Sequence, residues 1–111
     1  MSKSVKSTVF LDDKNLSVKE LMFSGDVKTI EENIVSQNNL GIVLAISAVI
    51  KNKLHTPTIE EALRELVKKN EFEFCINISS LAYAALDILS IEKYTGNDKQ
   101  VFDILSKGLS Y

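Results

Sequence analysis

The sequence has few of the residues that form tight turns or that carry metal and redox chemistry. It contains one proline, four glycines, one cysteine and one histidine in 111 residues, and no tryptophan. So few prolines and glycines disfavour a β-sandwich or barrel, which needs many turns, and favour helices. The single cysteine, Cys75, cannot form a disulfide within the chain, which indicates a reducing compartment. We therefore expect a cytoplasmic protein with little turn structure.

Arginine is also scarce, because Arg64 is the only one among thirteen basic residues, and the net charge is −2. Nucleic-acid binding depends on basic stripes and on bidentate arginine contacts, so we expect no nucleic-acid partner. The longest apolar stretch, residues 40–50, is shorter than the roughly 20 residues that a membrane-spanning helix needs. The apolar run that follows the N-terminal lysines, residues 9–11, is too short for an export signal. The sequence thus predicts neither a membrane partner nor an export signal.

The proportions of hydrophobic and charged residues are typical of one globular domain. Hydrophobic residues make up 45% of the chain and charged residues 25%, which is an ordinary balance for a globular domain. We expect a single all-α domain over residues 1–111, with residues 1–14 as an extended or flexible N-terminal arm. Apolar periodicity predicts five to six helices, at about residues 17–24, 27–35, 37–54, 57–70, 72–94 and 99–107.

Capping residues support several of these boundaries. Asp26 and Asp98 are placed to cap the helices that follow them, and Gly108 is placed to end the last helix. Pro57 suits the first turn of a helix, and Thr58 with Glu61 has the spacing of a capping box.

The segment at residues 71–78 is ambiguous. Phe72, Phe74 and Ile76 alternate as in a strand, whereas the residues from Ile78 onward follow a helical period. We predict one helix over residues 72–94, because a lone strand has no evident partner, and leave helix or strand open for residues 71–78. Cys75 lies between apolar neighbours, so we expect a buried, inert thiol.

A pattern of Leu and Ala residues is repeated along the chain. Residues 44–49 recur as residues 81–86, and residues 63–67 recur as 101–105 with one residue inserted. Over residues 26–108 this resembles HEAT or armadillo repeats, in which antiparallel helical hairpins stack, although the HEAT proline and aspartate pattern is absent apart from Pro57. The alternative is an irregular helical bundle.

The repeat also accounts for the apolar stretch at residues 40–50. The middle helix of a stack has neighbours on both sides, and a helix that is apolar all round is a buried one. The alternative is that this stretch forms a partner interface or a dimer seam.

Residues for catalysis are lacking. His55 has no orienting acid or nucleophile near it in the sequence, and acids flank Cys75, which disfavours an activated thiol. A structural zinc site takes four Cys or His ligands, and the chain has two such residues. The chain also has no glycine-rich phosphate loop and no nucleophile elbow. We expect neither an enzyme nor a bound metal or cofactor.

Acidic residues recur on the second helix of each expected hairpin. They are Glu31, Glu32, Glu60, Glu61, Glu65, Asp98 and Asp103. In a HEAT-like stack the second helices line the concave side, so these residues predict an acidic protein-binding face. The alternative is a solvated surface with favourable acids in first helical turns.

Size, charge and helical architecture together resemble those of bacterial immunity proteins of the contact-dependent growth inhibition type. That resemblance implies a protein that neutralises a toxin, possibly a nuclease, by binding it and occluding its active site. The alternative is a small helical-repeat adaptor or regulatory subunit for another cellular or phage protein. In either case we expect a protein partner, and a monomer or weak dimer when the chain is free.

Overall fold

The computed structural model describes the backbone of residues 12–108 and the side chains of residues 18–108. Six helices and one short β-hairpin make up this part of the chain, which confirms the all-α prediction. The elements are α1 (Asp12–Phe23), α2 (Val27–Ile34), α3 (Asn39–Asn52), α4 (Pro57–Leu66), β1 (Phe72–Glu73), β2 (Ile76–Asn77), α5 (Ile78–Ile88) and α6 (Lys99–Lys107).

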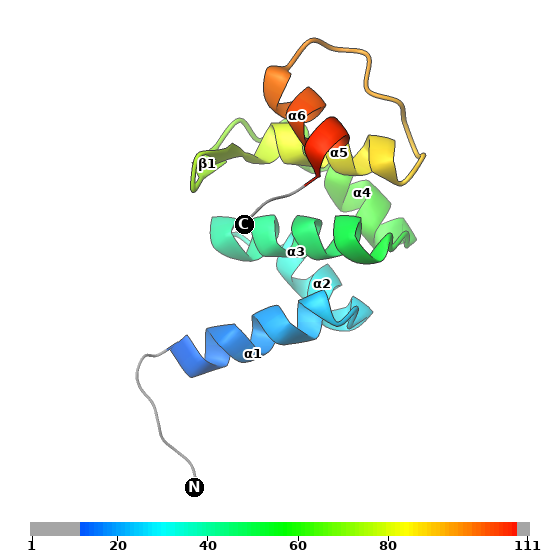
Figure 1. Ribbon diagram of the computed structural model, residues 1–111. Helices are drawn as coiled ribbons and strands as arrows, with labels where there is room; N and C mark the ends of the chain where they lie inside the picture. The colour runs from blue at the N-terminus through cyan, green and yellow to red at the C-terminus, as the bar shows by residue number, and fades with distance from the viewer. Residues whose placement is uncertain (1–11, 109–111) are drawn as a thin grey trace, which may run out of the picture.

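The odd-numbered helices lie one above another, as Figure 1 shows for α1, α3 and α5. Helix α2 packs against both α1 and α3, α4 packs against α5 and α2, and α6 packs against α5. Each even-numbered helix therefore packs on at least one odd-numbered helix, and one apolar core runs through the molecule.

Helix α3 is the central element, as the apolar stretch at residues 40–50 predicts. It contacts α1, α2 and α5, and residues 41–49 are buried except for Leu44. Asn38 begins the helix by accepting a hydrogen bond from the Gly41 N–H at 3.1 Å. A Cβ on Gly41 would come within 2.8 Å of Asn33 Oδ1, so a larger residue there would displace the Asn33 side chain at the contact between α2 and α3.

Most predicted boundaries agree with the structure, and one cap differs. Asp26 and Asp98 cap α2 and α6, Gly108 ends α6, and Pro57 begins α4. The cap of α4 is Thr56 rather than the predicted pair of Thr58 and Glu61, because the hydroxyl of Thr56 accepts the Ile59 N–H at 3.1 Å. Helix α1 begins at Asp12, inside the segment predicted as an arm, and residues 1–11 lie outside the described part.

The prediction of one helix over residues 72–94 is wrong at both ends. Residues 72–77 form an antiparallel hairpin in which Glu73 pairs with Ile76. Helix α5 begins only after Asn77, whose side chain accepts the Ser80 N–H at 3.1 Å, and it ends at Ile88. A strand partner was available only two residues away, so the alternating residues pair locally instead of continuing the helix.

Candidate functional site

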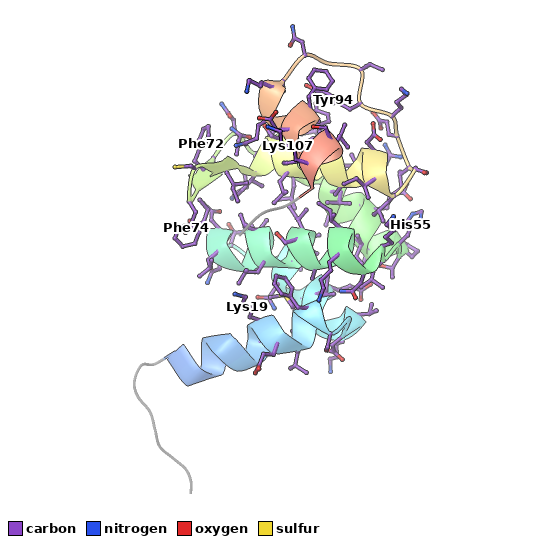
Figure 2. All side chains as sticks on the ribbon, viewed as in Figure 1. Lys19, His55, Phe72, Phe74, Tyr94 and Lys107 are labelled. Atoms are coloured by element: carbon purple, nitrogen blue, oxygen red, sulfur yellow. The ribbon has the colours of Figure 1, made fainter. Side chains whose placement is uncertain are left out.

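The hairpin presents large apolar side chains to solvent. Phe72 is 63% exposed and Phe74 is 72% exposed, the highest fractions among the exposed large hydrophobic residues of the described part. Figure 2 shows both at one edge of the molecule, beside the N-terminal end of α3. Cys75 beside them is also exposed, so the prediction of a buried thiol is wrong, because Cys75 occupies the turn itself. We call residues 72–76 the hairpin tip.

The turn of the hairpin tip has an unfavourable backbone conformation. Phe74 has φ 54° and Cys75 has φ 65°. Positive φ at both central residues defines a type I′ turn, in which Asn-Gly is strongly preferred. A left-handed conformation costs an ordinary L-residue roughly 1–2 kcal/mol. Strain of this kind is concentrated at functional sites, where the surrounding structure maintains it.

One side chain from α6 holds the hairpin in place. Gln100 Oε1 accepts a hydrogen bond from the Asn77 N–H at 2.8 Å, and its Nε2 donates to the Cys75 carbonyl at 3.1 Å. The Ile78 N–H also donates to the Glu71 carbonyl at 2.8 Å, across the base of the hairpin. Gln100 therefore ties the hairpin to α6, and the bond between Ile78 and Glu71 closes its base.

An ionised carboxylate lies at the base of the hairpin. Glu71 accepts a hydrogen bond from Asn39 Nδ2 at 3.1 Å and lies 3.5 Å from Lys69 Nζ. The Asn39 hydrogen bond, with a smaller contribution from Lys69, lowers the pKa of Glu71 below its usual value. Lys69 partly offsets the charge of Glu71, so Glu73 is the main source of negative charge beside the two phenylalanines.

A second surface feature is a hollow between α2 and α4, with a volume of about 460 Å³. Its apolar lining includes Val35, which is 59% exposed, and Leu66. Glu61 and Glu65, one turn apart on α4, line the same hollow together with Lys69. We call this the α2–α4 hollow.

The beginning of α4 carries a third feature, a more open hollow of about 580 Å³ that also includes Glu61 and Glu65. Here His55 Nε2 lies 2.7 Å from Glu60 Oε1, and Arg64 bridges Glu60 at 3.2 Å and Glu92 at 2.7 Å. The hydrogen bonds with His55 and then Arg64 lower the pKa of Glu60, and the pKa of Arg64 is raised by Glu92 and Glu60. These charges are therefore largely neutralised within the protein.

Comparison with known proteins gave no match. No family model, no curated protein and no solved structure matches the chain. The function has to be argued from the surfaces of the chain itself.

The structure brings together only some of the acidic residues that the sequence analysis singled out. Glu61 and Glu65 share both hollows, and Glu60 lines one of them. Glu31 accepts a hydrogen bond from Thr56 Oγ1 at 2.6 Å and so ties α2 to the start of α4.

The remaining acids lie outside both hollows. Asp98 caps α6 and accepts a hydrogen bond from the Ser80 hydroxyl, and Asp103 pairs with Lys99 at 3.5 Å. Glu32 is exposed and lines neither hollow. These acidic residues therefore do not form one continuous face across the even-numbered helices.

Catalytic and metal-binding groups do not converge in the described part of the chain. Figure 2 places His55 at the edge opposite Phe74, the neighbour of Cys75, so these residues do not form a pair. Within residues 18–108 no three His, Cys, Asp or Glu side chains are arranged to hold a metal ion. None of the helices described is both long and apolar enough to span a membrane.

The sequence analysis missed the exposure of the two phenylalanines and of Val35. The alternating pattern at residues 72–76 was a usable signal, since alternation predicts one exposed face on a short strand. Val35 lies off the apolar stripe of Val27, Ile30 and Ile34, so the helical period of this segment already separates it from the buried Ile34 beside it.

Proposed function

We propose that this chain is a non-catalytic protein-binding domain, and that it acts as an immunity protein that neutralises a bacterial toxin. The observation that supports this best is the hairpin tip, where two exposed phenylalanines lie on a strained turn. Aromatic residues on a pre-organised backbone dominate many protein–protein interfaces, because little conformational entropy is lost when they bind.

The size of the hairpin tip argues for a partner that encloses it. Two phenylalanines alone expose far less than the roughly 800 Å² per partner that a stable interface buries. The hairpin tip therefore acts as one anchor in a larger contact, inserted into an apolar pocket of the partner. An immunity protein that occludes an active site makes this kind of contact.

Charge around the hairpin tip fits a basic partner. Glu73 lies between the two phenylalanines and has no ion pair among the described residues, whereas Glu71, which precedes them, is already paired with Lys69. A toxin that cleaves nucleic acid carries cations in its active site to bind phosphate, and carboxylates placed there would compete with the substrate. Complementary charge would also accelerate association.

One observation favours the alternative of an adaptor or regulatory subunit. The hairpin tip and the hollow around His55 lie at opposite edges of the molecule (Figure 2), so the chain could engage two proteins at once. The neighbouring gene discriminates between these functions. A gene that encodes a toxin-like domain favours immunity, and a housekeeping operon favours an adaptor.

The experiment measures binding of the purified product of the neighbouring gene to wild type and to Phe74→Ser. Loss of binding in Phe74→Ser, with an unchanged helical spectrum, is the expected result. Leu21→Ser is the matched control, because Leu21 is also an exposed apolar residue, at 47%, but lies on α1. Equal weakening by both changes would remove the hairpin tip from the interface, and no binding by wild type would reject immunity toward that protein.

A further inference from the structure

We infer that the α2–α4 hollow binds a cationic amphipathic segment of the partner protein. In this interaction a lysine or arginine pairs with Glu61 and Glu65, and an apolar side chain covers Val35 and Leu66. The inference rests on the proposed protein-binding function and assigns a chemistry to a second surface of the same interface.

The charges that line the hollow are unevenly compensated. Lys69 is only 23% exposed at its side chain and already pairs with Glu71 at 3.5 Å. The side chain of Glu61 has no hydrogen bond or ion pair with any residue in the described part. The contact of Glu65 with Lys68 joins two highly exposed side chains at 3.6 Å, and such pairs contribute little. The hollow therefore retains two carboxylates that an external cation can neutralise.

The spacing of these carboxylates also indicates an external cation. Glu61 and Glu65 are four residues apart on α4, so they lie on the same face of the helix and repel each other. A cation placed between them would change this repulsion into attraction. The neighbouring Glu60 differs, because His55 and Arg64 already occupy its carboxylate oxygens.

The apolar lining specifies the second part of the ligand. Val35 is 59% exposed although it directly follows the buried Ile34, and it borders the same hollow as Leu66 and Ala62, which are each 8% exposed. A free lysine or a metal ion would leave this surface in water. A peptide segment that carries both a cation and an apolar side chain would cover it, as amphipathic helices do in apolar grooves.

A second copy of the chain is a less suitable occupant. Two copies each carry a net charge of −2, and both contain the same pair of glutamates at the hollow. Like charges at an interface oppose association. The charge balance therefore favours a basic partner.

The test uses two fluorescein-labelled amphipathic helical peptides of about four turns, one of Lys and Leu and one of Glu and Leu. Binding to the full chain is measured by fluorescence anisotropy at low and at high salt. Wild type should bind the Lys/Leu peptide at least about tenfold more tightly than the Glu/Leu peptide. Glu61→Gln/Glu65→Gln should weaken the Lys/Leu complex by about tenfold, and Val35→Ser should weaken it even at high salt, where charge is screened.

The control is Glu20→Gln/Asp103→Asn, which changes the net charge equally at residues outside the hollow. It should weaken binding by less than about twofold. Equal weakening by the two double variants would show a response to net charge alone and overturn the inference. Absence of Lys/Leu binding, or a dimer in sedimentation that Val35→Ser abolishes, would overturn it as well. Circular dichroism establishes that each variant is folded.

These outcomes are separate from those that test the proposed function. The peptides require no knowledge of the natural partner, so failure of peptide binding leaves binding through the hairpin tip unaffected. Conversely, the peptide could bind at the hollow while Phe74→Ser leaves binding of the neighbouring gene's product unchanged. That result would support the hollow as a binding site and reject the hairpin tip as one.

Discussion

Replacing the strained turn should make the protein more stable and less able to bind. The change is Phe74→Asn/Cys75→Gly, which introduces the dipeptide that a type I′ turn prefers. Both wild-type residues have positive φ, at 54° and 65°. Both are exposed, so little buried contact is lost when they are removed.

The expected gain follows from the backbone. Two ordinary residues in the left-handed region cost roughly 2–4 kcal/mol together. The greater freedom of glycine in the unfolded chain offsets about 0.5–1 kcal/mol of this, and asparagine retains a small cost of its own. The net stabilisation should therefore be about 1–3 kcal/mol. For a domain of this size each kcal/mol raises Tm by roughly 4 °C or more.

Thermal and urea unfolding, followed by circular dichroism, measure this change. An unchanged or lower Tm would show that the turn is not strained and would remove the main argument for the hairpin tip as a functional feature. Glu73→Gly is the control, since Glu73 lies in β1 and not among the positive-φ residues, so glycine there should destabilise. The stabilised variant should also lose binding to the partner, the stability–function trade-off expected of a strained site.

Three further outcomes test the packing and the charges. Ala48→Leu and Ala85→Leu should each lower the free energy of unfolding in urea by about 1–3 kcal/mol, because both alanines are fully buried and α3 contacts α5. An unchanged urea midpoint for both variants would place these alanines outside the core. Gln100→Ala removes both hydrogen bonds to the hairpin, so amide hydrogen exchange at Asn77 should accelerate while exchange in α3 stays the same. Equal acceleration at Asn77 and in α3 would indicate global destabilisation instead. The pKa of Glu60 is lowered in the folded protein, so its ionised carboxylate stabilises the fold at pH values above its ordinary pKa of 4.5, and this stabilisation is lost as pH falls through the lowered pKa. Glu60→Gln should therefore flatten the decline of the free energy of unfolding below about pH 4.5. An unaltered decline would contradict this linkage.

The sequence by itself predicts the helical elements well. The apolar stretch of α3, the caps at Asp26 and Asp98, and the first-turn proline of α4 are all local signals, readable within a few residues. They succeed because helix hydrogen bonds and capping contacts join residues three or four apart. The core position of α3 follows as well, since a helix that is apolar all round has no face to expose.

The hairpin tip required the tertiary structure. Phe-Cys is an unfavourable pair for a type I′ turn, so no turn signal marks it, and a continuous helix is the simpler local interpretation. The strands pair locally, but the hairpin is also held by Gln100, which lies 23 residues beyond Asn77 and 25 beyond Cys75. A contact between residues so distant in sequence has no counterpart in local propensity.

The arrangement of the acidic residues was decided in the same way. Spacing along the chain places Glu60, Glu61 and Glu65 on one helix but does not show which of them has a partner. The approach of Arg64 to Glu92, 28 residues away, and of Thr56 to Glu31, 25 residues away, results from the packing of the helices. The packing also leaves the Glu61 carboxylate without a partner among residues 18–108, because a charge is neutralised by its neighbours in space and not by its neighbours in sequence.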